Sequence, residues 1–186
     1  MSYQIGGSCQ IRGRERMLAA AIATLIIALP IAAAADPIVD CNQTRDATRQ
    51  LRGCTAYLRL LSADPGDRAV ALLNRANIYA RDSRYAQALM DYKKARELDP
   101  TNALVPYNLG NVHIDLGQLD RAEEALSQAI ALDGTFALAY LNRGIARESL
   151  GNRAGADEDF RRALELDPTI AGARRRLDAS PFRLPP

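Results

Sequence analysis

Apolar residues in the middle of the chain recur at the three- and four-residue spacing of amphipathic helices. Between residues 69 and 102, one such stretch ends near residue 80 and a second begins near residue 88. Their apolar positions are Leu72, Ala76, Tyr79 and Ala80, followed by Ala88, Leu89, Tyr92, Ala95 and Leu98. Because the apolar residues of each stretch fall on one side of a helix, the pattern predicts two consecutive helices that pack together.

This helix pair recurs along the chain at a step of 34 residues. The small residues that keep the step are Ala76, Gly110 and Gly144; Ala88, Ala122 and Ala156; and Ala95, Ala129 and Ala163. Such a period with small residues at fixed positions is typical of stacked helix–turn–helix units, which bind partners along an extended surface. The sequence therefore predicts an all-α solenoid of three full repeats at 69–102, 103–136 and 137–170.

The residue types at the recurring positions have a physical explanation. Small residues let the two helices of a unit approach closely, since bulky contact residues would push the helix axes apart. The larger Tyr92, Leu126 and Phe160 are expected to fill the space between units. Gly117 and Gly151 follow predicted helix ends, where glycine adopts the left-handed conformation at low cost.

With these features the chain resembles the tetratricopeptide repeat family. The matching residues, unit by unit, are Leu72, Ala76, Tyr79, Ala88, Tyr92, Ala95 and Pro100; Tyr107, Leu109, Gly110, Ala122, Leu126, Ala129 and Gly134; and Tyr140, Gly144, Ala156, Phe160, Ala163 and Pro168. The chain departs from the family pattern where Arg75 and Arg143 replace a leucine, and where His113 and Arg147 occupy an aromatic position. The resemblance implies a groove lined by the first helix of each unit, which binds a protein or peptide.

Residues 1–35 have the composition of a secretory signal peptide. Three arginines precede the uncharged run Met17–Leu29, and an alanine-rich segment follows, so cleavage is expected between Ala35 and Asp36. The sequence thus predicts export to the periplasm. Two alternatives remain open: Met17–Ala35 is long enough to serve as an uncleaved membrane anchor, and Met17 is a possible start of translation.

Residues 36–68 are predicted to form a degenerate N-terminal half-repeat. Leu58, Leu61 and Asp64-Pro65 resemble the end of a second helix. Cys41 and Cys54 are the two cysteines that remain after signal removal, and an exported chain is expected to join them in a disulfide. A zinc site would need two further ligands, so no metal is expected there.

The C-terminal segment 171–186 is predicted to be a cap helix, ending near Asp178, followed by a tail. The whole chain has 24 basic and 22 acidic residues, and removing residues 1–35 leaves 21 of each sign. A balanced chain offers no support for a nucleic-acid partner. The oligomeric state does not follow from the sequence.

The sequence gives no indication of catalysis or of a cofactor. His113 is the only histidine, and no phosphate-binding glycine loop or paired-histidine metal motif is present. Since acid–base or nucleophilic catalysis needs several cooperating groups, the chain is predicted not to be an enzyme.

The predicted ligand groove combines an asparagine column with apolar neighbours. Its residues are Asn74, Asn77, Asn108, Asn111, Asn142, Leu73, Tyr107 and Leu141. Side-chain amides can pair with the backbone of an extended peptide, although asparagines at such positions also serve turns or the repeat itself. In relatives that grip the carboxylate terminus of heat-shock chaperones, two asparagines act with basic residues. Asn77 and Asn108 match the amides, but Leu73, Leu138 and Asn142 occupy the basic positions, so that activity is not expected.

We therefore expect a non-enzymatic adaptor or scaffold that binds a peptide or partner protein in its concave groove in the periplasm. The alternative is a structural assembly module that builds an envelope complex through its ends or its convex surface.

Overall fold

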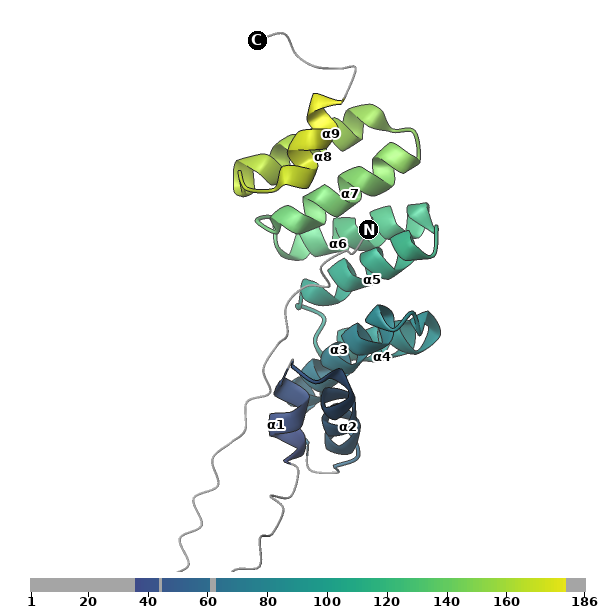
Figure 1. The fold of residues 1–186 in the computed structure, drawn as a ribbon, viewed down its shortest axis with the longest axis vertical. Coiled ribbons are helices and arrows are strands. Elements are labelled where there is room, and N and C mark those ends of the chain that lie inside the picture. The colour runs from purple at the N-terminus through teal and green to yellow at the C-terminus, as the bar shows by residue number, and fades with distance from the viewer. Residues whose placement is uncertain (1–35, 44, 61–62, 180–186) are drawn as a thin grey trace, which may run out of the picture.

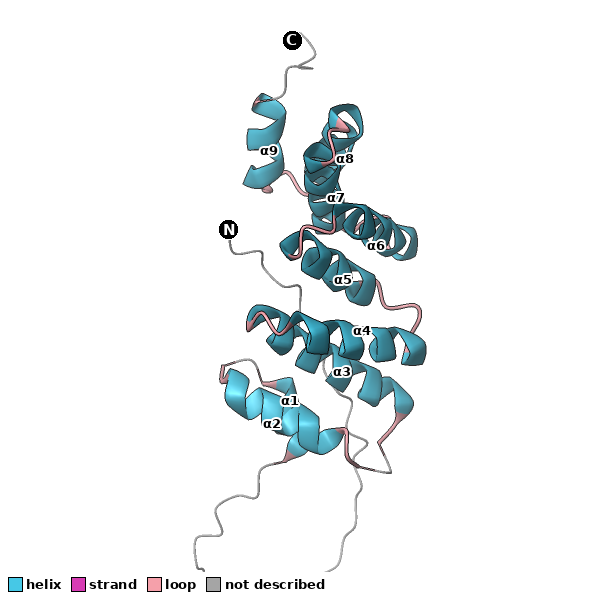
Figure 2. Ribbon diagram, turned by 90° about the vertical axis from the view of Figure 1, so that its right-hand side faces the viewer, coloured by secondary structure: helices cyan, strands magenta, loops and turns pink. Residues whose placement is uncertain are grey.

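The computed structural model describes residues 36–43, 45–60 and 63–179, and within them every regular element is a helix. The predicted signal peptide and the tail from residue 180 lie outside these residues. The helices are α1 (Pro37–Asn42), α2 (Ala47–Tyr57), α3 (Pro65–Arg81), α4 (Tyr85–Leu98), α5 (Leu104–Asp115), α6 (Leu119–Leu132), α7 (Ala137–Ser149), α8 (Arg153–Leu166) and α9 (Ala171–Asp178). They stack in chain order into an elongated array (Figure 1; Figure 2), which confirms the all-α tandem-repeat fold.

Three helix pairs, α3–α4, α5–α6 and α7–α8, correspond to the recurring units. Helix α3 starts at Pro65, four residues before residue 69, because Asp64 caps it by accepting a hydrogen bond from the Gly66 amide at 2.9 Å. The prediction that Asp64-Pro65 ends the preceding helix was therefore wrong, since α2 already ends at Tyr57.

The turns inside the three units share one backbone conformation. Gly117 and Gly151 have φ values of 69° and 85°, in the left-handed region where glycine carries no steric cost. In the first unit Ser83 has a φ of 57°, so a side-chain-bearing residue adopts the same turn there.

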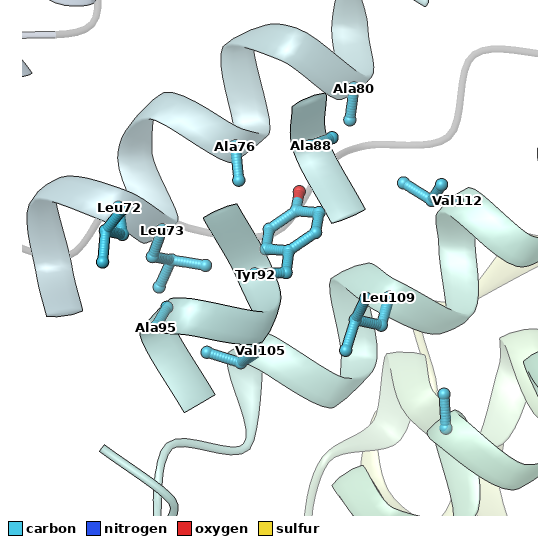
Figure 3. Close-up of a cluster of buried hydrophobic side chains, with 11 residues drawn as sticks. Leu72, Leu73, Ala76, Ala80, Ala88, Tyr92, Ala95, Val105, Leu109 and Val112 are labelled. Atoms are coloured by element: carbon cyan, nitrogen blue, oxygen red, sulfur yellow. The ribbon is translucent and has the colours of Figure 1, made fainter. Parts of the chain in front are cut away.

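The large residues that the sequence predicts at contacts lie in the interior of the helix array. Tyr92, Leu126 and Phe160 are fully or almost fully buried. Figure 3 shows the Tyr92 ring surrounded by small and aliphatic residues of α3, α4 and α5. A Cβ built on Gly110 would lie 2.5 Å from Leu126 Cγ, so glycine is needed there for the close approach of α5 and α6.

The N-terminal helices α1 and α2 are joined by the predicted disulfide, Cys41–Cys54. A Cβ built on Gly53 would lie 2.6 Å from the backbone nitrogen of Cys41, so this pair also depends on a close approach. Arg49 Nε donates to the buried carboxylate of Asp40 at 2.6 Å. Within the described ranges no helix combines the length and apolarity needed to cross a membrane.

Candidate functional site

The asparagine column predicted from the sequence forms a ladder between consecutive units. Nδ2 of Asn108 donates to Oδ1 of Asn77 at 2.9 Å, and Nδ2 of Asn142 donates to Oδ1 of Asn111 at 2.7 Å. Nδ2 of Asn74 donates to the Cys41 carbonyl at 3.3 Å, which continues the ladder to α1. Each of these bonds connects the first helix of one unit to the first helix of the unit before it.

The ladder is buried, which differs from the exposed column expected from the sequence. Asn74 and Asn108 are each 1% exposed and Asn142 is 3% exposed. Leu73, Tyr107 and Asn111 are buried as well. The first helices approach closely enough for the amides to bond with each other, so these six side chains are not presented to a ligand in this structure. Of the eight predicted groove residues, Asn77 and Leu141 retain partial exposure.

Two tyrosine hydroxyls extend the ladder. Tyr92 Oη donates to Asn77 Oδ1 at 2.7 Å, and Asn142 Nδ2 also lies 3.3 Å from Tyr107 Oη. Burial raises the pKa of both phenols, so both hydroxyls remain protonated. The Tyr107 ring packs on Phe136 with ring centroids 4.5 Å apart. These contacts make the column part of the repeat packing.

A second row on the first helices is accessible. Val70, Leu104 and Leu138 are 34 residues apart and occupy one equivalent position in α3, α5 and α7. Val70 and Leu104 are half-buried, whereas Leu138 is exposed. The partly exposed Leu141 lies one helical turn after Leu138. Sequence alone did not reveal which positions of the first helices are covered by neighbouring repeats.

Helix α9 closes the C-terminal end. Ala173 is buried against the cluster that contains Phe160, and a Cβ on Gly172 would be in van der Waals contact with Leu141. Arg176 pairs with Glu148 of α7. The cap thus covers part of the last unit.

His113 lies in α5 beside the turn to α6. Its Nδ1 is 2.9 Å from Gln118 Oε1, a contact that spans the turn. Among the residues that the structure describes, no three histidine, cysteine, aspartate or glutamate side chains are arranged to hold a metal ion.

Comparison with protein families gives two matches to tetratricopeptide repeat models, over residues 79–142 and 137–170. Solved structures of this family are also similar. The first such domain of Spaghetti (RPAP3), bound to an HSP90 peptide, is 31% identical, with 61% of this chain and 90% of that chain covered and a TM-score of 0.60. The second domain of human RPAP3, in complex with an HSP70 peptide, is also 31% identical, with coverages of 62% and 97% and a TM-score of 0.60.

The crystal structure of MamA is also similar to this chain. It is 26% identical, with 73% of this chain and 82% of that chain covered and a TM-score of 0.61. No curated protein sequence matches this chain. The repeat period, the stacked helix pairs and the 31% identity over most of the RPAP3 domains agree with one another. The chain belongs to the tetratricopeptide repeat family.

Proposed function

We propose that this chain is a non-enzymatic adaptor that binds an extended peptide segment of a partner protein along α3, α5 and α7. The observation that carries the proposal is the accessible row of Val70, Leu104 and Leu138, with one aliphatic side chain from each unit. A peptide with apolar side chains at matching intervals covers this row and removes its surface from water. Similar domains of RPAP3 bind heat-shock-protein peptides, which supports a peptide as the class of ligand.

The ligand differs in chemistry from an acidic chain terminus. The positions that would be basic in a carboxylate-binding relative hold Leu73, Leu138 and Asn142, and two of these are buried. The row therefore selects apolar side chains, and binding depends only weakly on salt. A three-repeat surface gives a modest interface, with a dissociation constant on the order of micromolar.

We place this adaptor in the periplasm. The basic, apolar and alanine-rich segments of residues 1–35 and the Cys41–Cys54 pair support export. Mass spectrometry of the protein from its native host should identify Asp36, or a near neighbour, as the first residue. An intact Met1 in a cytosolic fraction would refute this location.

Peptide binding along the row of Val70, Leu104 and Leu138 is tested with a photo-crosslinking residue placed at position 138, compared with one at position 132. Leu132 is 45% exposed on α6 and is a matched control outside the row. The segment captured from position 138 is then titrated against the wild-type chain and against Leu104→Glu combined with Leu138→Glu. We expect this double variant to lose at least tenfold in affinity, while Leu132→Glu binds like wild type.

The alternative, an assembly module that uses its convex or end surfaces, rests on Leu98 and Leu132. These leucines hold one equivalent position in α4 and α6 and are exposed at 40% and 45%. The same variants separate the two functions. Sedimentation velocity measures whether the chain assembles as its concentration rises. If Leu132→Glu abolishes such assembly while Leu104→Glu with Leu138→Glu leaves it intact, the alternative is favoured and the adaptor is contradicted.

A further inference from the structure

A pocket separate from the row of Val70, Leu104 and Leu138 lies at the junction of the N-terminal helix pair and the first full repeat. It is a pocket of about 630 Å³ between α2, α3 and α4. Its apolar lining includes Leu58, Leu72 and Leu98, and its cationic lining includes Arg59, Arg68 and Lys94. The volume lies within the range of about 300–1,000 Å³ typical of ligand sites. None of these residues belongs to the row of Val70, Leu104 and Leu138 on the first helices.

The pocket exists because α2 is short. Helix α2 has 11 residues, whereas α4, α6 and α8 have 14 each. The chain leaves the helix at Leu58, so the faces of α3 and α4 beyond this point are not covered by a further turn of α2.

The full set of cations in the pocket is found at this junction alone among the three. Counting 34 residues onward, Asn102, Pro106 and Gln128 replace Arg68, Leu72 and Lys94 at the next junction. At the junction after that, Phe136 and Tyr140 replace Arg68 and Leu72, whereas Arg162 stands at the position of Lys94. The positions equivalent to Arg59 hold Lys93 and then Ser127. Each later junction keeps one of the three cations, so the repeat architecture does not require the full set.

The cations of the pocket differ in their ion-pair and hydrogen-bond partners. Asp91 holds Arg75, which also lines the pocket, through contacts of 2.6 and 2.9 Å. Arg68 donates to the backbone carbonyl of Leu60 at 3.3 Å. Within the described part of the chain, none of the ion pairs includes Arg59, Arg68 or Lys94. Glu97 is the one carboxylate among the lining residues, so the pocket carries a net positive charge.

We propose that this pocket binds an acidic peptide segment in which carboxylates flank an aliphatic side chain. The carboxylates pair with Arg59, Arg68 and Lys94, while the aliphatic group packs on Leu58, Leu72 and Leu98. Guanidinium groups suit carboxylates because they donate two parallel hydrogen bonds. A small inorganic anion would leave the leucines uncovered, and the balanced charge of residues 36–186 gives no broad field for nucleic acid.

The pocket is therefore a second recognition site that prefers acidic segments, whereas the proposed row of Val70, Leu104 and Leu138 prefers apolar ones. A partner that presents an apolar stretch next to an acidic one binds both sites. Binding of one segment raises the effective concentration of the other, so the overall affinity exceeds that of either segment alone.

The experiment titrates the full, isotope-labelled chain with an acetylated and amidated peptide of alternating glutamate and leucine. We expect amide shifts confined to α2, α3, α4 and the turn at Leu58–Leu60. A peptide with glutamine in place of glutamate should bind at least tenfold more weakly. Arg59→Glu combined with Lys94→Glu should likewise lose at least tenfold in affinity, and both side chains are exposed, so the fold is retained.

The matched control is Lys93→Glu, which reverses the neighbouring exposed charge on α4 outside the pocket. It should change the affinity less than twofold. Leu104→Glu with Leu138→Glu should also retain acidic-peptide binding, which separates this site from the proposed groove. Equal binding of the glutamine peptide, equal losses from Lys93→Glu, or tighter binding to anionic lipid vesicles than to the peptide would each overturn the proposal.

Discussion

The Arg75 guanidinium on α3 holds the Asp91 carboxylate on α4 through two hydrogen bonds, Nε to Oδ2 at 2.6 Å and Nη2 to Oδ1 at 2.9 Å. In the second unit the same two positions hold Leu109 and Ala125. In the third unit they hold Arg143 and Asp159, again joined by two bonds. The arginine that departs from the family pattern is therefore one half of a helix–helix pair, and its partner changes with it.

This pair predicts a specific result for single and double substitutions. Asp91 is almost fully buried and Arg75 has a side-chain exposure of 19%, so removing one partner leaves the other charge poorly solvated. Asp91→Ala alone should lower the free energy of unfolding by about 3 kcal/mol. Arg75→Leu combined with Asp91→Ala, the combination found in the second unit, should recover most of that loss. Urea unfolding of wild type, Arg75→Leu, Asp91→Ala and the double variant measures both effects, and additive losses in the double variant would contradict the pairing.

The glycines of the first helices give a second prediction. A Cβ on Gly144 would lie 2.5 Å from Phe160 Cε1, so Gly144→Ala forces α7 and α8 apart or displaces the ring. Such overpacking should lower the free energy of unfolding by about 1–3 kcal/mol. Gly134→Ala is the matched control, because its Cβ would meet nothing closer than Ile130 O at 4.0 Å. Thermal unfolding should leave that control near wild type, and equal losses for both variants would disprove the close-approach explanation.

The amide ladder gives a third prediction. Asn142 donates to Asn111 Oδ1 and lies against Tyr107 Oη, so Asn142→Ala removes the donor that both buried acceptors use. We expect a loss of about 1–2 kcal/mol in the free energy of unfolding. Amide hydrogen exchange should be faster in α5 and α7. Binding of the crosslinked groove segment should change less than twofold while the protein is folded. Unchanged stability together with a large loss of affinity would mean that Asn142 contacts the ligand and does not serve the repeat packing.

The sequence predicted the fold because periodicity depends only on local helix formation and on small residues at contacts. Gly110, Gly144 and the large residues between units are identifiable from a single sequence, since their spacing repeats. The disulfide was also predictable, because the two cysteines form an even pair in a chain with an apparent export signal.

The candidate site was less predictable because exposure depends on the distance between neighbouring units. Asn108 and Leu104 both lie on the first helix of the second unit, yet Asn108 meets Asn77 and is buried while Leu104 keeps partial exposure. Similarly, Arg75 looked like an unexplained departure from the family pattern, because Asp91 lies 16 residues away on another helix. The sequence contained both partners, but only the packing of α3 on α4 shows that they meet.

Buried tyrosines give the last prediction, a loss of stability in alkali. Burial, followed by the charge and hydrogen bond of Asp67, raises the pKa of Tyr57 from 10.0 to about 12. Burial also raises the pKa of Tyr92. In this range the unfolded chain releases phenolic protons that the folded protein retains, so the stabilisation is complete below pH 10 and falls as pH rises toward 12.

The variant Tyr92→Phe should separate titration from packing. It removes the hydrogen bond to Asn77, which should cost about 1 kcal/mol at pH 7. Because phenylalanine has no proton to lose, its stability should fall less steeply above pH 10 than that of wild type. Urea unfolding at a series of pH values from 7 to 11 measures both quantities. Parallel curves for wild type and variant across the alkaline range would mean that the Tyr92 proton does not contribute to the pH dependence.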